Sequence, residues 1–221
     1  MSGPPAGLRT VLLDLDGTLI DSEELILASY RHTLRTHRGQ APPDDAWLET
    51  MGQPLEAQLR DFAEDEAEVR AMTETYIEHN DRVHDDLLRR YPGVREAVAG
   101  LRERGLRLGI VTSKRREKTL RGLEACGYPL DWFASVVTAS DLEAHKPDPA
   151  PVRMALREME ERPGRALFAG DSVHDLRAGR AAGVRTAAAL WGPYDRDRLA
   201  PGEPDLWLER PEDLLAAVPS G

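Results

Sequence analysis

Two aspartates separated by one residue follow an apolar run near the start of the chain. Residues 11–13 are apolar, Asp14 follows them directly, and Asp16, Gly17 and Thr18 come next. Successive side chains of a strand point to opposite sides, so both carboxylates lie on one side of the strand's end. A polar turn is the alternative interpretation of these residues. Carboxylates placed in this way can act as nucleophile, as acid and base, or as metal ligands.

Three further β-rich apolar runs end in polar side chains. They are residues 108–111, 136–138 and 166–169, followed in turn by Thr112 and Ser113, by a loop with Lys146, and by Asp171 and Asp175. A helical pattern follows each run, and this alternation predicts an α/β fold with a parallel sheet and helices on both faces. Ligands of such sheets bind beyond the carboxyl ends of the strands. We therefore expect the polar residues to meet at that edge.

The residue types at this edge favour phosphoryl transfer. A phosphoryl group in transfer carries charge on three oxygens, so its site needs a nucleophile and positive charge. Asp14, Asp16 and Asp171 offer the hard oxygen ligands that suit Mg²⁺. Lys146 adds a fixed positive charge and Thr112 a hydroxyl donor for phosphate oxygens. One carboxylate remains free to attack the phosphorus atom.

These four segments, in this order, resemble the haloacid-dehalogenase superfamily. They are DLDGT at 14–18, the Thr-Ser pair at 112–113, KPDP at 146–149 and GDSVHD at 170–175. The resemblance implies a Rossmann-like parallel sheet core and an Mg²⁺-dependent hydrolase. It also separates this chain from the dehalogenase branch, which lacks a carboxylate at the position of Asp16.

The resemblance implies a role for each site residue. Asp14 becomes an aspartyl phosphate, and Asp16 protonates the leaving oxygen and then activates water. Mg²⁺ is bound by Asp14, by Asp171 and by the backbone carbonyl of Asp16, while Thr112 and Lys146 hold phosphate oxygens. Asp175 orients Lys146 or a metal-bound water. We also expect three residues to bind the phosphate: Gly17, Thr18 and Ser113.

The segment between the first two site strands predicts an inserted helical subdomain. Asp21 or Ser22 begins a helix that runs to about His37, and further helical segments follow at 45–62 and 65–88. After the last motif we expect three more elements: a buried strand at 186–190, an edge strand at 204–208 and a helix at 211–218.

This insertion resembles the helical cap of the phosphoglycolate-phosphatase-like subfamily. The predicted domains are a cap at 20–88 and a core formed by 1–19 and 89–221. A cap that closes over the phosphate contacts the leaving group, so we expect substrate specificity to depend on it. The candidate contacts in the cap are Gly52, Gln53, Asn80 and His84.

Several functions remain open at this point. The bacterial pyrophosphatase type has the strongest resemblance, although the pair Asp21-Ser22 is usual in phosphoglycolate phosphatases. Both activities act on small anions, so the expected substrate is a small phosphorylated metabolite or pyrophosphate. A β-phosphoglucomutase-like phosphotransferase shares every core residue. An alternative from a different functional class is a protein that binds Mg²⁺ and phosphate but catalyses no reaction.

Composition limits the partners. The net charge of −10 argues against a nucleic-acid partner, and the chain has no apolar run of the length needed to cross a membrane. Its single cysteine, Cys126, predicts no disulfide. We therefore expect a cytoplasmic monomer or weak homodimer.

Only three of the chain's 29 basic residues are lysines, namely Lys114, Lys118 and Lys146, and all three follow site strands. For Lys114 and Lys118 two interpretations stay open. Either they attract the phosphate of the substrate, or they lie on a helix face that is exposed to solvent.

Overall fold

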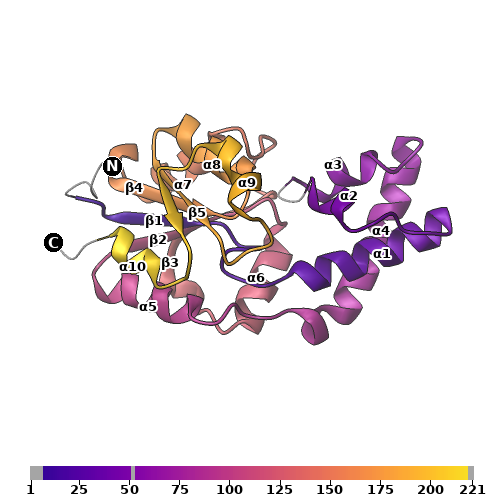
Figure 1. Cartoon of the computed structure of the whole chain (residues 1–221), viewed down its shortest axis with the longest axis horizontal. Coiled ribbons are helices and arrows are strands. Elements are labelled where there is room, and N and C mark those ends of the chain that lie inside the picture. Colours follow the sequence, from indigo (N-terminus) through magenta and orange to yellow (C-terminus); the bar gives the residue numbers. More distant parts are fainter. Residues whose placement is uncertain (1–6, 51–52, 219–221) are drawn as a thin grey trace.

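A six-stranded parallel sheet forms the centre of the protein, with strand order β3-β2-β1-β4-β5-β6. The computed structural model describes residues 7–50 and 53–218. The strands are β1 (Thr10–Leu13), β2 (Arg107–Val111), β3 (Phe133–Val137), β4 (Ala166–Gly170), β5 (Arg185–Ala189) and β6 (Leu206–Leu208). All neighbouring strands pair in parallel (Figure 1). The predicted α/β fold is confirmed, and β6 lies at the sheet edge as expected.

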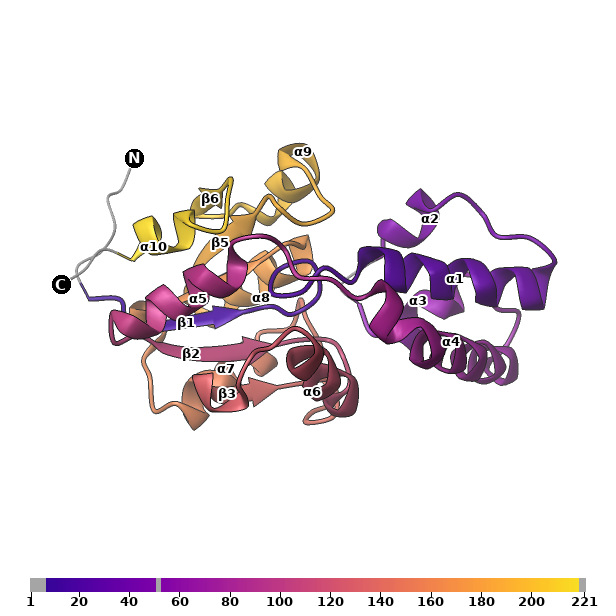
Figure 2. The same ribbon diagram turned by 90° about the horizontal axis from the view of Figure 1, so that it is seen from below.

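Helices cover both faces of this sheet. One face carries α5 (Val94–Glu103), α6 (Arg116–Ala125) and α10 (Asp213–Ala217), and the other carries α7 (Ala150–Glu158) and α8 (Val173–Ala182). A short helix, α9 (Arg196–Leu199), and three 3₁₀ turns complete the connections. Figure 2 shows α5 and α6 on the near side of the sheet. No helix in the described ranges is long and apolar enough to cross a membrane.

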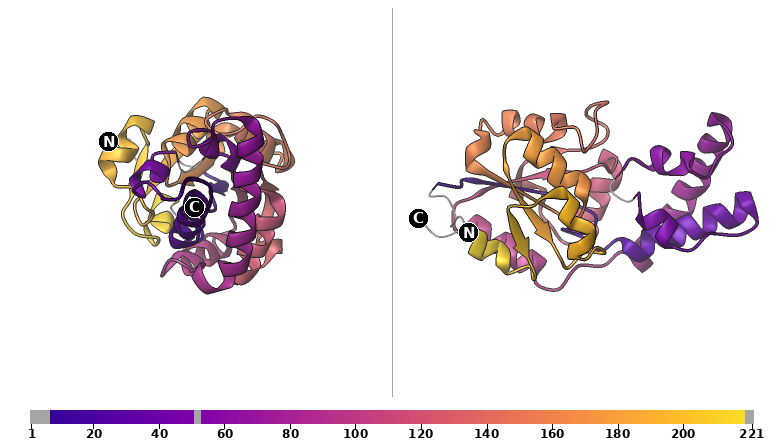
Figure 3. Two further views of the ribbon diagram at one scale, coloured as in Figure 1. Left: turned by 90° about the vertical axis from the view of Figure 1, so that its right-hand side faces the viewer. Right: turned by 45° about the horizontal axis from the view of Figure 1, so that its top comes forward.

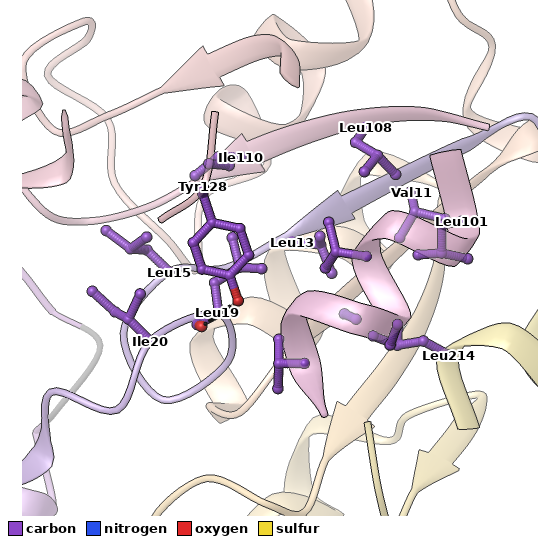
Figure 4. Packing of buried hydrophobic residues seen from close by; sticks show 14 of the residues in the cluster. Val11, Leu13, Leu15, Leu19, Ile20, Leu101, Leu108, Ile110, Tyr128 and Leu214 are labelled. Atoms are coloured by element: carbon purple, nitrogen blue, oxygen red, sulfur yellow. Dashed lines mark hydrogen bonds between the residues drawn. The ribbon is translucent and has the colours of Figure 1, made fainter. Parts of the chain in front are cut away.

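The core explains why the strands read as continuous apolar runs. A parallel strand covered on both faces needs apolar side chains on both sides. In β1, Val11 and Leu13 pack into the cluster on one face, whereas Leu12 packs into the cluster on the other. Figure 4 shows the first cluster, which also contains Leu101 of α5 and Leu214 of α10. Strand β1 is therefore held on both faces at the point where it delivers Asp14.

Four helices between β1 and α5 form a separate helical lobe, defined as residues 23–87. They are α1 (Glu23–Arg38), α2 (Asp45–Leu48), α3 (Leu55–Arg60) and α4 (Glu66–Leu87). The lobe has its own core, in which Tyr30, Trp47, Leu59 and Met72 are fully buried. Figures 1 and 3 show that the lobe lies beyond the end of the sheet toward which β1 points, not over either face.

The chain enters and leaves the lobe at one place. Asp21 and Arg89 pair there as an antiparallel bridge, with N···O distances of 3.0 and 2.9 Å in the two directions. Two paired connections restrict how the lobe can twist relative to the sheet. The lobe is therefore held beside the carboxyl ends of the strands.

The helical segment predicted at 45–62 is divided in the structure. The structure has a single short turn of helix in α2 and a second short helix, α3, which Pro54 precedes in an extended conformation. Proline has no N–H to donate, so it begins a helix but does not continue one. The other two helices predicted in this region are confirmed as α1 and α4.

Candidate active site

A buried lysine links two carboxylates at the carboxyl edge of the sheet. The Nζ of Lys146 donates to Asp14 Oδ1 at 2.7 Å and also to Asp175 Oδ1. The second oxygen of Asp175 accepts from the backbone N–H of Ser172 at 3.0 Å and from its hydroxyl, in a capping box that begins α8. Asp175 is therefore fully engaged and holds Lys146 against Asp14.

Asp171 is fixed by close packing against a glycine turn. Thr18 Oγ1 donates to Asp171 Oδ1 at 3.0 Å. Gly17 has a φ of +79°, and a Cβ on it would lie 2.1 Å from Asp171 Oδ2. Only glycine fits there, because any side chain would displace the carboxylate. A Cβ on Gly192 would lie 2.8 Å from Asp171 Cβ, so the carboxylate is enclosed on a second side.

The electrostatics of this cluster demand a counter-charge. Oxygens of Asp14, Asp171 and Asp175 lie within 4.8 Å of one another. Burial, followed by repulsion from Asp175, raises the pKa of Asp14 to about 7, although Lys146 opposes the shift. Burial and repulsion from Asp14 raise the pKa of Asp171 well above its usual value. Both carboxyls must therefore hold protons or share a cation.

The donor set fits a hard divalent cation. Asp175 uses both oxygens on Lys146 and Ser172, whereas Asp14 and Asp171 each keep one oxygen without a protein partner among the described residues. Few carboxylates together with water and substrate oxygens are the usual environment of Mg²⁺. The Asp16 side chain lies outside this carboxylate group. Its expected contribution, through the backbone carbonyl, stays a prediction.

Asp16 is oriented by two donors that come from different parts of the chain. Its Oδ1 accepts from Ser22 Oγ and from Lys114 Nζ, each at 2.6 Å. The sequence predicts Asp21 or Ser22 as the N-cap of α1, and Ser22 holds that position, but its side chain makes no capping hydrogen bond there. No local sequence pattern distinguishes a serine that caps a helix from one that donates to a distant carboxylate. The second oxygen of Asp16 has no protein partner among the described residues.

A cavity of about 510 Å³ lies between the sheet edge and the helical lobe. The sheet side contributes Asp14, Asp16, Thr112, Ser113, Lys146 and Asp171, and the lobe side contributes Gln53, Tyr76 and Asn80. Ser113 Oγ is buried at this wall without a hydrogen-bond partner among the described residues. A buried hydroxyl that lacks a protein partner is a ready donor for a ligand oxygen. The cavity therefore brings together carboxylates, the Lys146 ammonium group and hydroxyl donors.

The comparisons with known proteins agree with this geometry. A family model described as "Haloacid dehalogenase-like hydrolase" matches residues 11–189. The chain belongs to this family. Pyrophosphatase PpaX from Anoxybacillus flavithermus is 39% identical over 214 residues, which cover 96% of this chain and 97% of that protein. PpaX from Bacillus velezensis is 40% identical over 209 residues, with 94% and 95% covered.

Solved structures of haloacid dehalogenase-like hydrolases match over nearly the whole chain. A candidate phosphoglycolate phosphatase from Lactobacillus plantarum has a TM-score of 0.84 at 27% identity, covering 96% of this chain and 100% of that one. A candidate haloacid dehalogenase-like hydrolase from Bacteroides fragilis has a TM-score of 0.87 at 26% identity, covering 94% and 99%. The predicted superfamily and its resemblance to the bacterial pyrophosphatase type are confirmed, and the protein is an enzyme of the hydrolase class.

Not every predicted site residue of this hydrolase reaches the cavity. Gly17 and Thr18 lie behind Asp171 and support it. His84 is 1% exposed, its Nδ1 bonds with Asp85, and it is not part of the cavity wall. It shares a face of α4 with Asn80 but lies one turn farther along. The structure therefore does not bring His84 to the site. Gly52 lies outside the described residues.

All three lysines of this hydrolase line the cavity. The side chains of Lys114 and Lys118 are 14% and 16% exposed, so they are not a solvated helix face. Lys114 contacts Asp16, and Lys118 contacts Asp81 of the lobe. These two lysines therefore add positive charge to the cavity wall, whereas helix amphipathicity alone would have placed them in water.

Proposed function

We propose that this hydrolase is an Mg²⁺-dependent phosphatase for a small substrate with a second negative charge, either pyrophosphate or phosphoglycolate. The observation that carries the proposal is the contact between buried Asp14 and Lys146 in a cavity that also holds the Ser113 hydroxyl, which has no partner in the described part of the chain. This arrangement offers a nucleophile beside positive charge and hydroxyl donors, as a transferred phosphoryl group requires.

In the proposed reaction, a carboxylate oxygen of Asp14 bonds to phosphorus while the bond from phosphorus to the leaving oxygen breaks. Asp16 donates its proton to the leaving oxygen and then accepts a proton from the water that hydrolyses the aspartyl phosphate. Lys146 and Thr112 bind the phosphate oxygens, and Asp175 positions Lys146. Bound by Asp14 and Asp171, Mg²⁺ supplies positive charge that offsets repulsion between the carboxylates and the phosphate.

Two observations support a substrate with a second anionic group. Relatives that match over nearly their whole length are named pyrophosphatase. Lys114 and Lys118 add positive charge to the cavity beyond Lys146. We propose that the helical lobe acts as a cap, so that its residues Gln53 and Asn80 contact the leaving portion of the substrate. Lys114 and Lys118 pair with Asp16 and Asp81 in the structure, and an anionic leaving portion attracts them, whereas a neutral sugar offers them no opposite charge.

A panel of substrates at matched Mg²⁺ tests this proposal. Pyrophosphate, phosphoglycolate and hexose phosphates are compared by kcat/KM, with Asp14→Asn as the inactive control. We expect pyrophosphate or phosphoglycolate to exceed the hexose phosphates by about 10²-fold or more, because an anionic leaving portion attracts the lysines of the cavity and a neutral hexose does not. Preference for a hexose phosphate, or transfer of phosphate to a sugar in place of water, would contradict it.

A further inference from the structure

Tyr76 of α4 is held rigidly at the lobe wall of the catalytic cavity. Its side chain is 8% exposed and lines the cavity with Asn80, which follows one helical turn later. Its ring stacks on Trp47 with centroids 5.8 Å apart, and Trp47 stacks in turn on Tyr30 at 4.9 Å. Stacked rings inside a packed cluster have little freedom to rotate. The hydroxyl of Tyr76 is therefore a fixed group.

The hydrogen bonding of Tyr76 differs from that of every other buried tyrosine in the described part of the chain. The hydroxyls of Tyr30, Tyr128 and Tyr194 donate to the backbone carbonyls of Pro42, Leu19 and Leu48, respectively. Figure 4 shows the bond from Tyr128. Tyr76 has no such partner within residues 7–50 and 53–218. The Tyr76 hydroxyl is also not one of the fully buried polar atoms that lack a partner, so it is open to the cavity and can donate to a group that enters it.

Burial and a nearby carboxylate keep the hydroxyl of Tyr76 protonated. Burial raises its pKa well above the usual value, and the carboxylate of Asp16 raises it further. The hydroxyl is thus a neutral hydrogen-bond donor at neutral pH, on the side of the lobe that faces Asp16. It approaches the cavity from the lobe, opposite the sheet residues that surround Asp14.

We infer that the Tyr76 hydroxyl donates a hydrogen bond to an oxygen of the leaving portion of the substrate, which makes Tyr76 a specificity-determining residue. The inference rests on the proposed function and deepens it. A carboxylate or distal phosphate offers such an oxygen, whereas a plain phenyl group does not. The residues around Asp14 hold the transferred phosphoryl group, which all phosphate substrates share, so a residue that separates the substrates must contact the leaving portion, as Tyr76 does from the lobe.

The test compares Tyr76→Phe with Tyr30→Phe. Each removes one hydroxyl from the same aromatic cluster, but only the Tyr76 hydroxyl faces the cavity. For Tyr76→Phe we expect kcat/KM to fall about 10- to 100-fold for pyrophosphate or phosphoglycolate, as for a lost hydrogen bond to a charged group. Turnover of phenyl phosphate and the melting temperature should change little. Tyr30→Phe should leave the ratio between the substrates unchanged.

A binding measurement separates failure of this inference from failure of the proposed function. In the Asp14→Asn background with Mg²⁺, calorimetry follows pyrophosphate and phosphoglycolate binding with and without Tyr76→Phe. A weaker Kd, by about tenfold, supports the role of Tyr76 even if the wild-type enzyme turns over neither compound. Unchanged Kd and unchanged substrate ratios would overturn it, as would equal losses for all three substrates, which would indicate a structural role.

Discussion

Asp14 and Asp171 are two acidic side chains buried side by side in a cluster where Lys146 is the one cation among the described residues that opposes them. In the metal-free protein they keep their protons to higher pH when folded than when unfolded. The stability from this source is present in acid and is lost as the pH rises through about 7, the folded pKa of Asp14.

Mg²⁺ should therefore stabilise the protein more in base than in acid. The carboxyl groups must lose their protons before they can bind Mg²⁺, and at pH 6 the cation competes with those protons. We expect the rise in melting temperature on adding Mg²⁺ to a chelator-treated sample to be larger at pH 8 than at pH 6. An equal rise at both pH values, or a larger rise at pH 6, would show that these carboxyls do not bind the metal.

Gly17 tests how closely the position of Asp171 controls activity. Gly17→Ala places a Cβ 2.1 Å from Asp171 Oδ2 at a φ of +79°, whereas Gly39→Ala at a φ of +75° meets nothing within 4 Å. Both changes should cost about 1–2 kcal/mol of unfolding free energy through backbone strain. Only Gly17→Ala should also lower kcat, by about 10²-fold as for a displaced catalytic group. Equal kcat in both variants would show that the position of Asp171 does not control activity.

At the scale of elements, α6 of the core faces the lobe with basic side chains. Lys118 and Arg121 both contact Asp81 of α4, and Arg115 contacts Glu56 of α3. These pairs join the two walls of the cavity, so they favour the arrangement in which lobe residues reach the substrate. Partly exposed pairs are weak singly, but Asp81 serves two of them.

Asp81→Asn should therefore loosen the lobe. We expect KM to rise about two- to fivefold, as the loss of up to 1 kcal/mol implies, with little change in kcat. High salt should bring the wild-type KM toward that of the variant. Asp86→Asn is the matched control, because Asp86 is exposed on the same helix and forms no ion pair among the described residues. If both variants behaved alike, these pairs would have no part in substrate binding.

Strands and motifs could be predicted from the sequence because local patterns determine them. A parallel strand needs apolar residues on both sides, so each strand could be found as an apolar run. The polar motifs follow the ends of these strands, so the four motifs together identified the carboxyl edge of the sheet as the site. Contacts between distant segments leave no such pattern. The bond from Lys114 to Asp16 spans 98 residues, and the unpartnered Tyr76 depends on how the lobe lies against the sheet. His84 was expected on the right helix face, but it lies about 12 Å along the axis from Tyr76, two turns on.

At the scale of the whole molecule, the lobe and the sheet have separate hydrophobic cores. The lobe core centres on Trp47, which is fully buried and stacks on Tyr30, Phe62 and Tyr76. The two bodies meet at a smaller cluster, where the hydroxyl of Tyr194 donates to the carbonyl of Leu48. Such an arrangement allows the lobe to unfold while the sheet stays intact.

Trp47→Ala should therefore destabilise the lobe and leave the sheet folded. Loss of a large buried aromatic side chain costs about 3–5 kcal/mol, and we expect the cost to fall on the lobe. Hydrogen exchange should quicken in α1 and α4 while amides of β1 and β4 stay protected. Leu130→Ala, at a position 51% exposed, is the control and should change neither. Faster exchange throughout the sheet would mean that lobe and sheet unfold as one unit.

The most direct test of the account is whether Asp14 carries the phosphoryl group during turnover. The enzyme is mixed with Mg²⁺ and pyrophosphate or phosphoglycolate, quenched in acid within the first turnovers, digested and analysed by mass spectrometry. We predict one phosphorylated peptide, modified at Asp14, and a fall in kcat of about 10⁴-fold or more in Asp14→Asn, as the loss of one member of a catalytic unit commonly causes. Full turnover by Asp14→Asn, or a phosphate on another residue, would contradict the account.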